Sequence, residues 1–276
     1  MSGKMMEAGE ENGASRAREY SDRYWEACGG MLLEREVERA SIIASLIPED
    51  SNSVLEVGCG DGLIINMVTG TGRETMGLDL SESGIKGVRG PATVGSVSEL
   101  PFEDESWDAV IASEVIEHIP EEDYRQSLRE ISRVSRSCII VSVPNNENFE
   151  RNMTKCPRCG AKFHAYYHVR SYCHQDLESL FPGFKLSRCF DGGAHARTES
   201  RIELFFKHRV LDRWIPFGST VCPFCGYSRD EVVSGALTER RGGAGHDAVR
   251  KMARLLPFFN RTRRKWTFAI YSADRV

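Results

Sequence analysis

The stretch VLEVGCGDG, residues 54–62, decides the fold predicted for this chain. It joins a short apolar run, predicted as a strand over residues 53–57, to a helix predicted over residues 62–68. Its three glycines allow the backbone to turn tightly and approach a ligand, and the helix N-terminus that follows offers unpaired N–H groups. The segment therefore predicts a ligand-binding loop after a first strand.

Short apolar runs and helical patterns alternate on both sides of this loop. Strands are predicted over residues 75–80, 93–97, 107–112, 138–143, 184–190 and 266–273, and helices over residues 33–47, 124–134 and 175–181. Strands alternating with helices are typical of an α/β protein whose parallel sheet is covered on both faces. No pattern is evident over residues 192–264.

Two acidic residues indicate what the glycine loop holds. Asp79 ends the second strand, 21 residues after Gly58, where a carboxylate can bind both hydroxyls of a ribose. Glu56 stands inside the first strand. A dinucleotide fingerprint would have glycine or alanine at the position of Leu63, so a pyrophosphate ligand is disfavoured.

With GLDLSES (77–83) and VGSVSELPFEDESWDAVIASEVIEHI (94–119), the chain resembles the class I S-adenosylmethionine-dependent methyltransferases, closest to the ubiquinone/menaquinone-type branch. The resemblance implies a Rossmann-like, doubly wound, mostly parallel seven-stranded sheet whose last strand is antiparallel. It also implies that the glycine loop holds the methionine moiety, Asp79 the ribose, and residues 96–98 the adenine. The implied cofactor-binding residues are Glu56, Gly58, Cys59, Gly60, Asp79, Leu80, Ser96, Val97, Ser98 and Ser113. Tyr20, Tyr24 and Trp25 are expected to fold over the cofactor.

Methyl transfer to oxygen or nitrogen can require a base near the sulfonium. Glu114 and His118 are the catalytic candidates, although His118 could equally be a residue that only begins the next helix. His164 and His168, four residues apart, could bind a second metal or position an acidic substrate, and aromatic packing is the alternative.

Two CPxCG patterns predict a metal site. Cys156, Cys159, Cys222 and Cys225 have the two-residue spacer that lets paired sulfurs reach one ion. Four thiolates favour structural Zn²⁺ in a reducing compartment. Both pairs lie in connections expected at the cofactor edge of the sheet, so we expect a zinc-ribbon lid over the substrate cleft.

The predicted organisation has four parts. Residues 1–22 are a flexible tail, residues 23–150 the cofactor-binding core, residues 151–265 the zinc-ribbon and lid insertions around the sixth strand (184–190), and residues 266–276 the final antiparallel strand.

Composition indicates a globular protein with a formal net charge of −4. This overall charge does not favour binding to nucleic acid, so no nucleic-acid partner is predicted. Residues 236–266 carry a local charge of +7, however, from nine basic and two acidic side chains. This segment favours an anionic small-molecule acceptor, or a peripheral membrane contact through residues 250–265. With no secretory signal in the polar first residues, a cytoplasmic location is expected.

The predicted function is methyl transfer to an oxygen or nitrogen atom of a small molecule, such as a sugar, lipid-linked or natural-product acceptor. One alternative is an RNA or protein methyltransferase that grips its substrate through the zinc ribbon. The other is a non-catalytic zinc-ribbon scaffold with a vestigial cofactor site. The oligomeric state is not predicted.

Overall fold

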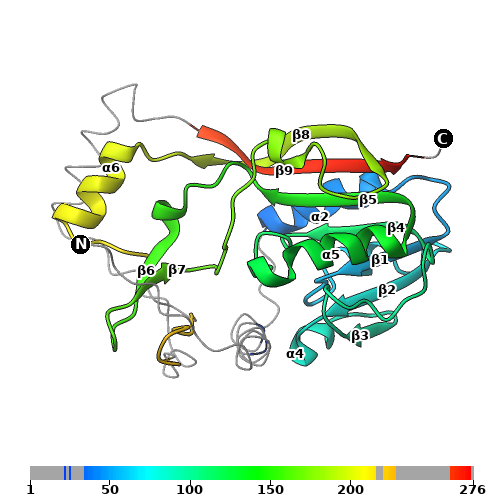
Figure 1. The fold of residues 1–276 in the computed structure, drawn as a ribbon, viewed down its shortest axis with the longest axis horizontal. Helices are drawn as coiled ribbons and strands as arrows, with labels where there is room; N and C mark the ends of the chain where they lie inside the picture. Colours follow the sequence, from blue (N-terminus) through cyan, green and yellow to red (C-terminus); the bar gives the residue numbers. More distant parts are fainter. Residues whose placement is uncertain (1–21, 23–24, 26–33, 216–219, 228–261, 275–276) are drawn as a thin grey trace.

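The structure is a computed structural model that describes residues 22, 25, 34–215, 220–227 and 262–274 (Figure 1). Most of the predicted N-terminal tail, and the basic segment except for its last residues, lie outside the described residues. No helix in the described ranges combines the length and apolarity needed to span a bilayer.

A single seven-stranded sheet forms the core, in the order β3-β2-β1-β4-β5-β9-β8. Its strands are β3 (Ala92–Val94), β2 (Glu74–Asp79), β1 (Ser53–Val57), β4 (Trp107–Ser113), β5 (Ser135–Pro144), β9 (Thr262–Ala273) and β8 (Phe184–Arg197). Neighbours from β3 to β5 pair in parallel, whereas β9 is antiparallel to both β5 and β8. The Rossmann-like, mostly parallel fold expected from the sequence is confirmed.

Helices cover both faces of this sheet, as Figure 1 shows for α2 and α5. On one face, α2 (Glu34–Leu46) and α3 (Ile65–Val68) pack against Val54 and Ile111. On the other, α5 (Glu121–Val134) packs against Leu55 and Val110. Consecutive strand residues point to opposite faces, so the fully apolar runs of β1 and β4 supply both layers at once.

The boundaries of several elements differ from the sequence-based predictions. The helix predicted over residues 175–181 is only a short 3₁₀ turn, η3 (Gln175–Leu177). Strand β3 ends at Val94 instead of residue 97, and α3 begins at Ile65, three residues after the predicted start. The glycine-loop turn occupies these first residues, because Gly62 donates to the Cys59 carbonyl instead of beginning the helix.

The region predicted to lack a pattern contains ordered elements. Strand β8 continues to Arg197 and β9 already begins at Thr262, so both are longer than the predicted 184–190 and 266–273. A register shift between Gly192 and His195 breaks the alternation of apolar residues that a sequence-based prediction needs. After β8 come α6 (Arg201–Phe205) and the π-helical turn η4 (Phe206–Val210).

The first insertion leaves the core at the carboxyl end of β5. It comprises η2 (Phe149–Asn152) and the two-stranded β6 (Met153–Lys155) and β7 (Lys162–His164). Figure 1 shows this small ribbon and α6 beside the core, away from β2 and β3. Since β8 is parallel to β5, the connections after both strands emerge at the same edge of the sheet, as the sequence predicted.

Candidate functional site

The glycine loop follows β1 directly, at the carboxyl edge of the sheet. Gly58 and Gly60 have φ angles of +66° and +52°, in the region that L side chains rarely adopt. A Cβ at Gly58 would lie 2.4 Å from the Val115 side chain. The Cys59 N–H donates to the Leu78 carbonyl at 3.0 Å, so the loop lies against the end of β2.

Asp79, the last residue of β2, binds the loop backbone. Its Oδ2 accepts the N–H of Gly60 and its Oδ1 accepts the N–H of Ser81, both at 2.8 Å. Burial raises the pKa of this carboxyl above its ordinary value, and these two hydrogen bonds oppose the rise. A carboxylate has about four acceptor positions, so the oxygens of Asp79 can still accept hydroxyl donors from a ligand.

Glu56 is buried beneath the loop. One of its carboxyl oxygens accepts the N–H of Ile65 at 2.8 Å, at the first turn of α3. Burial raises its pKa to about 8, although the hydrogen bond from Ile65 acts in the opposite direction. Glu56 therefore links β1 to the first turn of α3, on either side of the glycine loop.

Two N-terminal residues reach this edge of the sheet. The Trp25 ring lies over Gly60, where a Cβ would come within 2.0 Å of it, and it also contacts Gly84. Asp22 accepts the Ser81 hydroxyl at 2.5 Å and the Ser83 N–H at 3.2 Å. The prediction that an aromatic N-terminal segment covers this edge agrees with the position of Trp25. The other aromatic residues named for it, Tyr20 and Tyr24, lie outside the described residues.

The predicted adenine-binding residues lie just beyond β3. The hydroxyls of Ser96 and Ser98 are 2.8 Å apart, and the Ser98 N–H donates to the Ser96 hydroxyl at 3.2 Å. Val97 packs against the core cluster, and Leu80 follows Asp79 at the end of β2. These residues form the edge of the site on the side of β3.

Ser113 ends β4 and brings together groups that the sequence did not link. Its hydroxyl lies 2.8 Å from that of Ser142 and accepts a short hydrogen bond from Arg39 of α2. The Nε of Arg39 is buried without a partner among the described residues. The sequence did not indicate a role for Arg39, because it lies in a predicted helix with no ligand-binding motif.

The turn after β4 carries two unusual carboxyl groups. Glu114 adopts a φ of +56° and donates its N–H to the Ser142 carbonyl at 2.8 Å. Glu117 is fully buried, and neither of its carboxyl oxygens has a hydrogen-bonding partner in the described structure. Burial raises the pKa of both groups, and the nearby charge of Glu114 raises that of Glu117 further.

His118 meets the first insertion at this turn. Its ring lies 4.7 Å from that of His168, centroid to centroid, and His168 stacks on His164 at 4.6 Å. Although part of His118 is exposed, the protein around its ring and the charges of His168 and His164 lower its pKa. Glu114 and His118, the two predicted catalytic candidates, therefore lie at the carboxyl edge of the sheet, and His118 contacts His168 of the first insertion.

Glu147 anchors the histidine pair. One carboxyl oxygen makes a short hydrogen bond to Nδ1 of His168, and the other lies 3.3 Å from Nε2 of His164. Although Glu147 is largely buried, these histidines lower its pKa well below the ordinary value. The histidines are not on a helix, because His164 ends β7 and His168 follows a turn at Tyr167. Sequence analysis missed Glu147, which lies in no motif.

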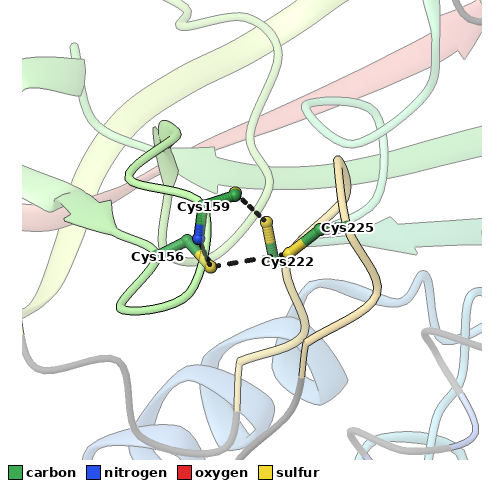
Figure 2. A group of neighbouring side chains, drawn as sticks. All are labelled: Cys156, Cys159, Cys222 and Cys225. Carbon is green, nitrogen blue, oxygen red and sulfur yellow. Dashed lines mark hydrogen bonds between the residues drawn. The ribbon is translucent and has the colours of Figure 1, made fainter.

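The four predicted metal ligands come together, as Figure 2 shows. The sulfur of Cys156 lies 3.7 Å from that of Cys225, and the sulfur of Cys159 lies 3.6 Å from that of Cys222. Tetrahedral Zn–S bonds of about 2.3 Å place sulfurs about 3.8 Å apart, so the donor set fits Zn²⁺. Each CPxCG turn forms one knuckle of this cluster. Tyr167, which follows the first knuckle, also contacts the start of the second, since its hydroxyl donates to the Val221 carbonyl at 2.8 Å.

Comparison with known proteins finds similarity to methyltransferases. Residues 55–138 match the model of a family described as a methyltransferase domain. A Mycolicibacterium smegmatis protein named "Probable S-adenosylmethionine-dependent methyltransferase" is 36% identical over 103 residues, which cover 35% of this chain and 39% of that protein. A ubiquinone biosynthesis O-methyltransferase of Xanthomonas axonopodis pv. citri is 26% identical over 149 residues, covering 50% of this chain and 59% of the relative.

Solved structures share the fold over most of the chain. One is a chain from the complex between the Haloferax volcanii Trm112 methyltransferase activator and a methyltransferase, with a TM-score of 0.54, 16% identity and coverage of 94% of this chain and 98% of that chain. Another is a Thermotoga maritima S-adenosylmethionine-dependent methyltransferase, with a TM-score of 0.50, 14% identity and coverage of 95% and 98%.

Residues 55–138 are thus similar to a methyltransferase domain, and the chain shares its Rossmann-like fold with these solved structures. The match with the mycobacterial relative spans about two fifths of that protein's length. The family model's match covers the glycine loop and β4 and ends before the two insertions.

Proposed function

We propose that this protein is an S-adenosylmethionine-dependent methyltransferase that transfers a methyl group to an oxygen or nitrogen atom of a small molecule. The observation that carries the proposal is the contact between Asp79 and the glycine loop, within the segment that matches the methyltransferase domain. A vestigial site would have no need of a buried carboxylate that orders the segments after β1 and β2, because burying it costs free energy.

The residues present fit the cofactor. The loop backbone at Gly58, Cys59 and Gly60 approaches the methionine moiety, with Glu56 supporting the loop from below. Asp79 accepts the ribose hydroxyls, and Leu80 with Ser96, Val97 and Ser98 flanks the adenine. Ser113 lies below the sulfonium, where Arg39 orders its hydroxyl. The cofactor supplies an activated methyl group, so the protein's task is alignment and exclusion of water.

The acceptor enters from the side of the first insertion in this proposal. His118 and Glu114 are placed to take a proton from an acceptor hydroxyl or amine, since both lie in the turn after Ser113. The lowered pKa of His118 keeps its imidazole neutral at physiological pH, and it also makes the ring a weaker base than an ordinary histidine. An anionic acceptor remains a prediction, because most of the basic segment lies outside the described residues.

Zn²⁺ in the four-cysteine cluster has a structural role in this proposal. Four thiolates leave the ion no open position, so it does not act on the methyl group. The cluster joins residues that follow β5 to residues that follow β8, and thereby fastens the two insertions into a lid. The proposed division of the chain remains a core over residues 23–150 and 266–276 and a lid over residues 151–265.

Transfer of a labelled methyl group from S-adenosylmethionine into cell extract tests the function. The products are separated into small-molecule, RNA and protein fractions, and the Asp79→Ala variant measures background. Label in the small-molecule fraction supports the proposal. Label confined to RNA or protein would favour the macromolecular alternative, and no label despite measured cofactor binding would favour the scaffold.

A further inference from the structure

The buried carboxyl group of Glu117 is unusual in the described part of the chain. It has no exposed surface, and both oxygens are without hydrogen-bonding partners among the described residues. Buried polar groups in proteins are nearly always paired, because an unpaired one costs about 1–3 kcal/mol. Such a group, unpaired among the described residues and placed at the edge of the sheet that carries the glycine loop, suits a partner from outside the chain.

Two imidazoles lie beside this carboxyl group. One donor atom each from Glu117, His118 and His168 lies within 4.8 Å of the other two. Bound to one ion through bonds of about 2.0–2.1 Å, such donors lie about 3.3 Å apart, so small side-chain movements would close the set. His118 is exposed, whereas Glu117 is fully buried, so the cluster is open on one side only.

Glu147 orients the ring of His168. Because its carboxylate accepts a hydrogen bond from Nδ1 of His168, the proton of the neutral ring is on Nδ1 and the lone pair is on Nε2. A carboxylate that orients a histidine through its second nitrogen is the usual support of a metal-binding imidazole. His164 stacks on the same ring and fixes its plane.

We propose that Glu117, His118 and His168 bind a divalent first-row transition metal, with Glu147 as the positioning residue for His168. Two imidazoles and one carboxylate are a donor set that suits Zn²⁺ or Fe²⁺ and leaves coordination positions free. The site is separate from the four-cysteine cluster and unites the turn after β4 with the first insertion. If the proposed methyl transfer is correct, a free position would bind the acceptor's oxygen or nitrogen beside Ser113. With the His118 lone pair on the metal, Glu114 would then be the group that takes the acceptor's proton.

Cobalt titration of the metal-stripped protein tests this site without any measurement of activity. Co²⁺ in the four-cysteine cluster gives intense sulfur-to-metal charge-transfer bands, whereas Co²⁺ bound by imidazole and carboxylate gives only weak visible bands. We expect two equivalents per chain in the wild type, one of each spectral type. Metal analysis after equilibration with Zn²⁺ provides an independent count.

Three variants locate the second equivalent. His168→Ala should lose the equivalent without charge-transfer bands and keep the other, and Glu147→Gln should weaken it by about 10–100-fold. His174→Ala is the matched control, because His174 is paired with Asp191 outside this cluster. Circular dichroism verifies folding, and Glu117→Gln replaces His168→Ala if that variant does not fold.

A single equivalent in the wild type, or two equivalents in both His168→Ala and Glu117→Gln, would overturn the proposal. Failure of the proposed function is distinguishable, because it would leave the cobalt stoichiometry at two while no methyl group is transferred.

Discussion

The carboxylate of Asp79 holds the backbone of Gly60, with 2.8 Å between Oδ2 and the amide nitrogen. The residue that ends β2 thereby fixes the loop that follows β1, and a second bond to Ser81 fixes the start of α4 (Glu82–Ile85). Asp79, the residue proposed to bind the ribose, is thus also a structural support of the proposed methionine-binding loop.

Replacing Asp79 should therefore weaken cofactor binding. Hydrogen bonds to charged groups contribute about 1.5–3 kcal/mol each, so we expect Asp79→Ala to lower the affinity for S-adenosylhomocysteine about 10–100-fold. Calorimetric titration measures this change. Asp104→Ala removes an exposed carboxylate elsewhere on the molecule and should bind like the wild type. Equal affinity of Asp79→Ala and the wild type would contradict the assignment of this site.

Glu56 should make stability depend on pH. Folded, its carboxyl has a pKa of about 8, against an ordinary value of 4.5, so the folded state binds more protons than the unfolded state between these values. The free energy of unfolding should consequently fall as pH rises through this window, by at most roughly 1.4 kcal/mol per pH unit. Urea unfolding from pH 5 to 8 measures the slope.

Glu56→Gln should flatten this slope, because the amide does not titrate, while Glu103→Gln at an exposed position should leave it unchanged. A slope that is the same in Glu56→Gln and the wild type would mean that Glu56 titrates normally.

Removing zinc should loosen the proposed lid and leave the core folded. The insertion's own cluster of buried residues is small and contains Cys156, Phe163 and Cys222, so without metal few contacts hold the knuckles. We expect a chelator to create protease cleavage sites within residues 151–227, identified by mass spectrometry, with β1 and β4 intact. Cys156→Ser should have the same effect, and Cys189→Ser on β8 serves as its control. Unchanged proteolysis after verified metal loss would refute the structural role.

Arg133 should stabilise the loop between β3 and β4. Its guanidinium donates to the carbonyls of Leu100 and Phe102 and pairs with Glu130 at 2.8 Å. We expect Arg133→Ala to lower the free energy of unfolding by about 1–3 kcal/mol, since the partners lose charged hydrogen bonds in a half-buried setting. Thermal and urea unfolding measure this. Arg129→Ala, which removes an exposed side chain of the same helix that bonds only Gln126 among the described contacts, should change stability far less.

Much of the fold was predictable because its signals are local. The strand over residues 53–57 was predicted with the bounds that β1 has, since a short apolar run ending in glycine is specified by its own residues. Strand β8 was predicted too short because its register shift near Gly193 depends on packing against Trp266, which lies far along the chain. The short 3₁₀ turn η3 replaced a predicted helix for a similar reason, since Leu177 and Phe181 are held by the core and not by a helical repeat.

The sequence by itself determined the glycine loop, Asp79 and the two cysteine knuckles, because each is a short motif whose residue types and spacing carry its chemistry. Only the tertiary structure decided that Glu147 holds His168 against the turn of Glu117 and His118. Those residues come from separate segments with no shared spacing, and their proximity results from the emergence of both connections at one edge of the sheet. Motif chemistry is local, whereas the burial that leaves Glu117 without a hydrogen-bonding partner among the described residues is a property of the packed molecule.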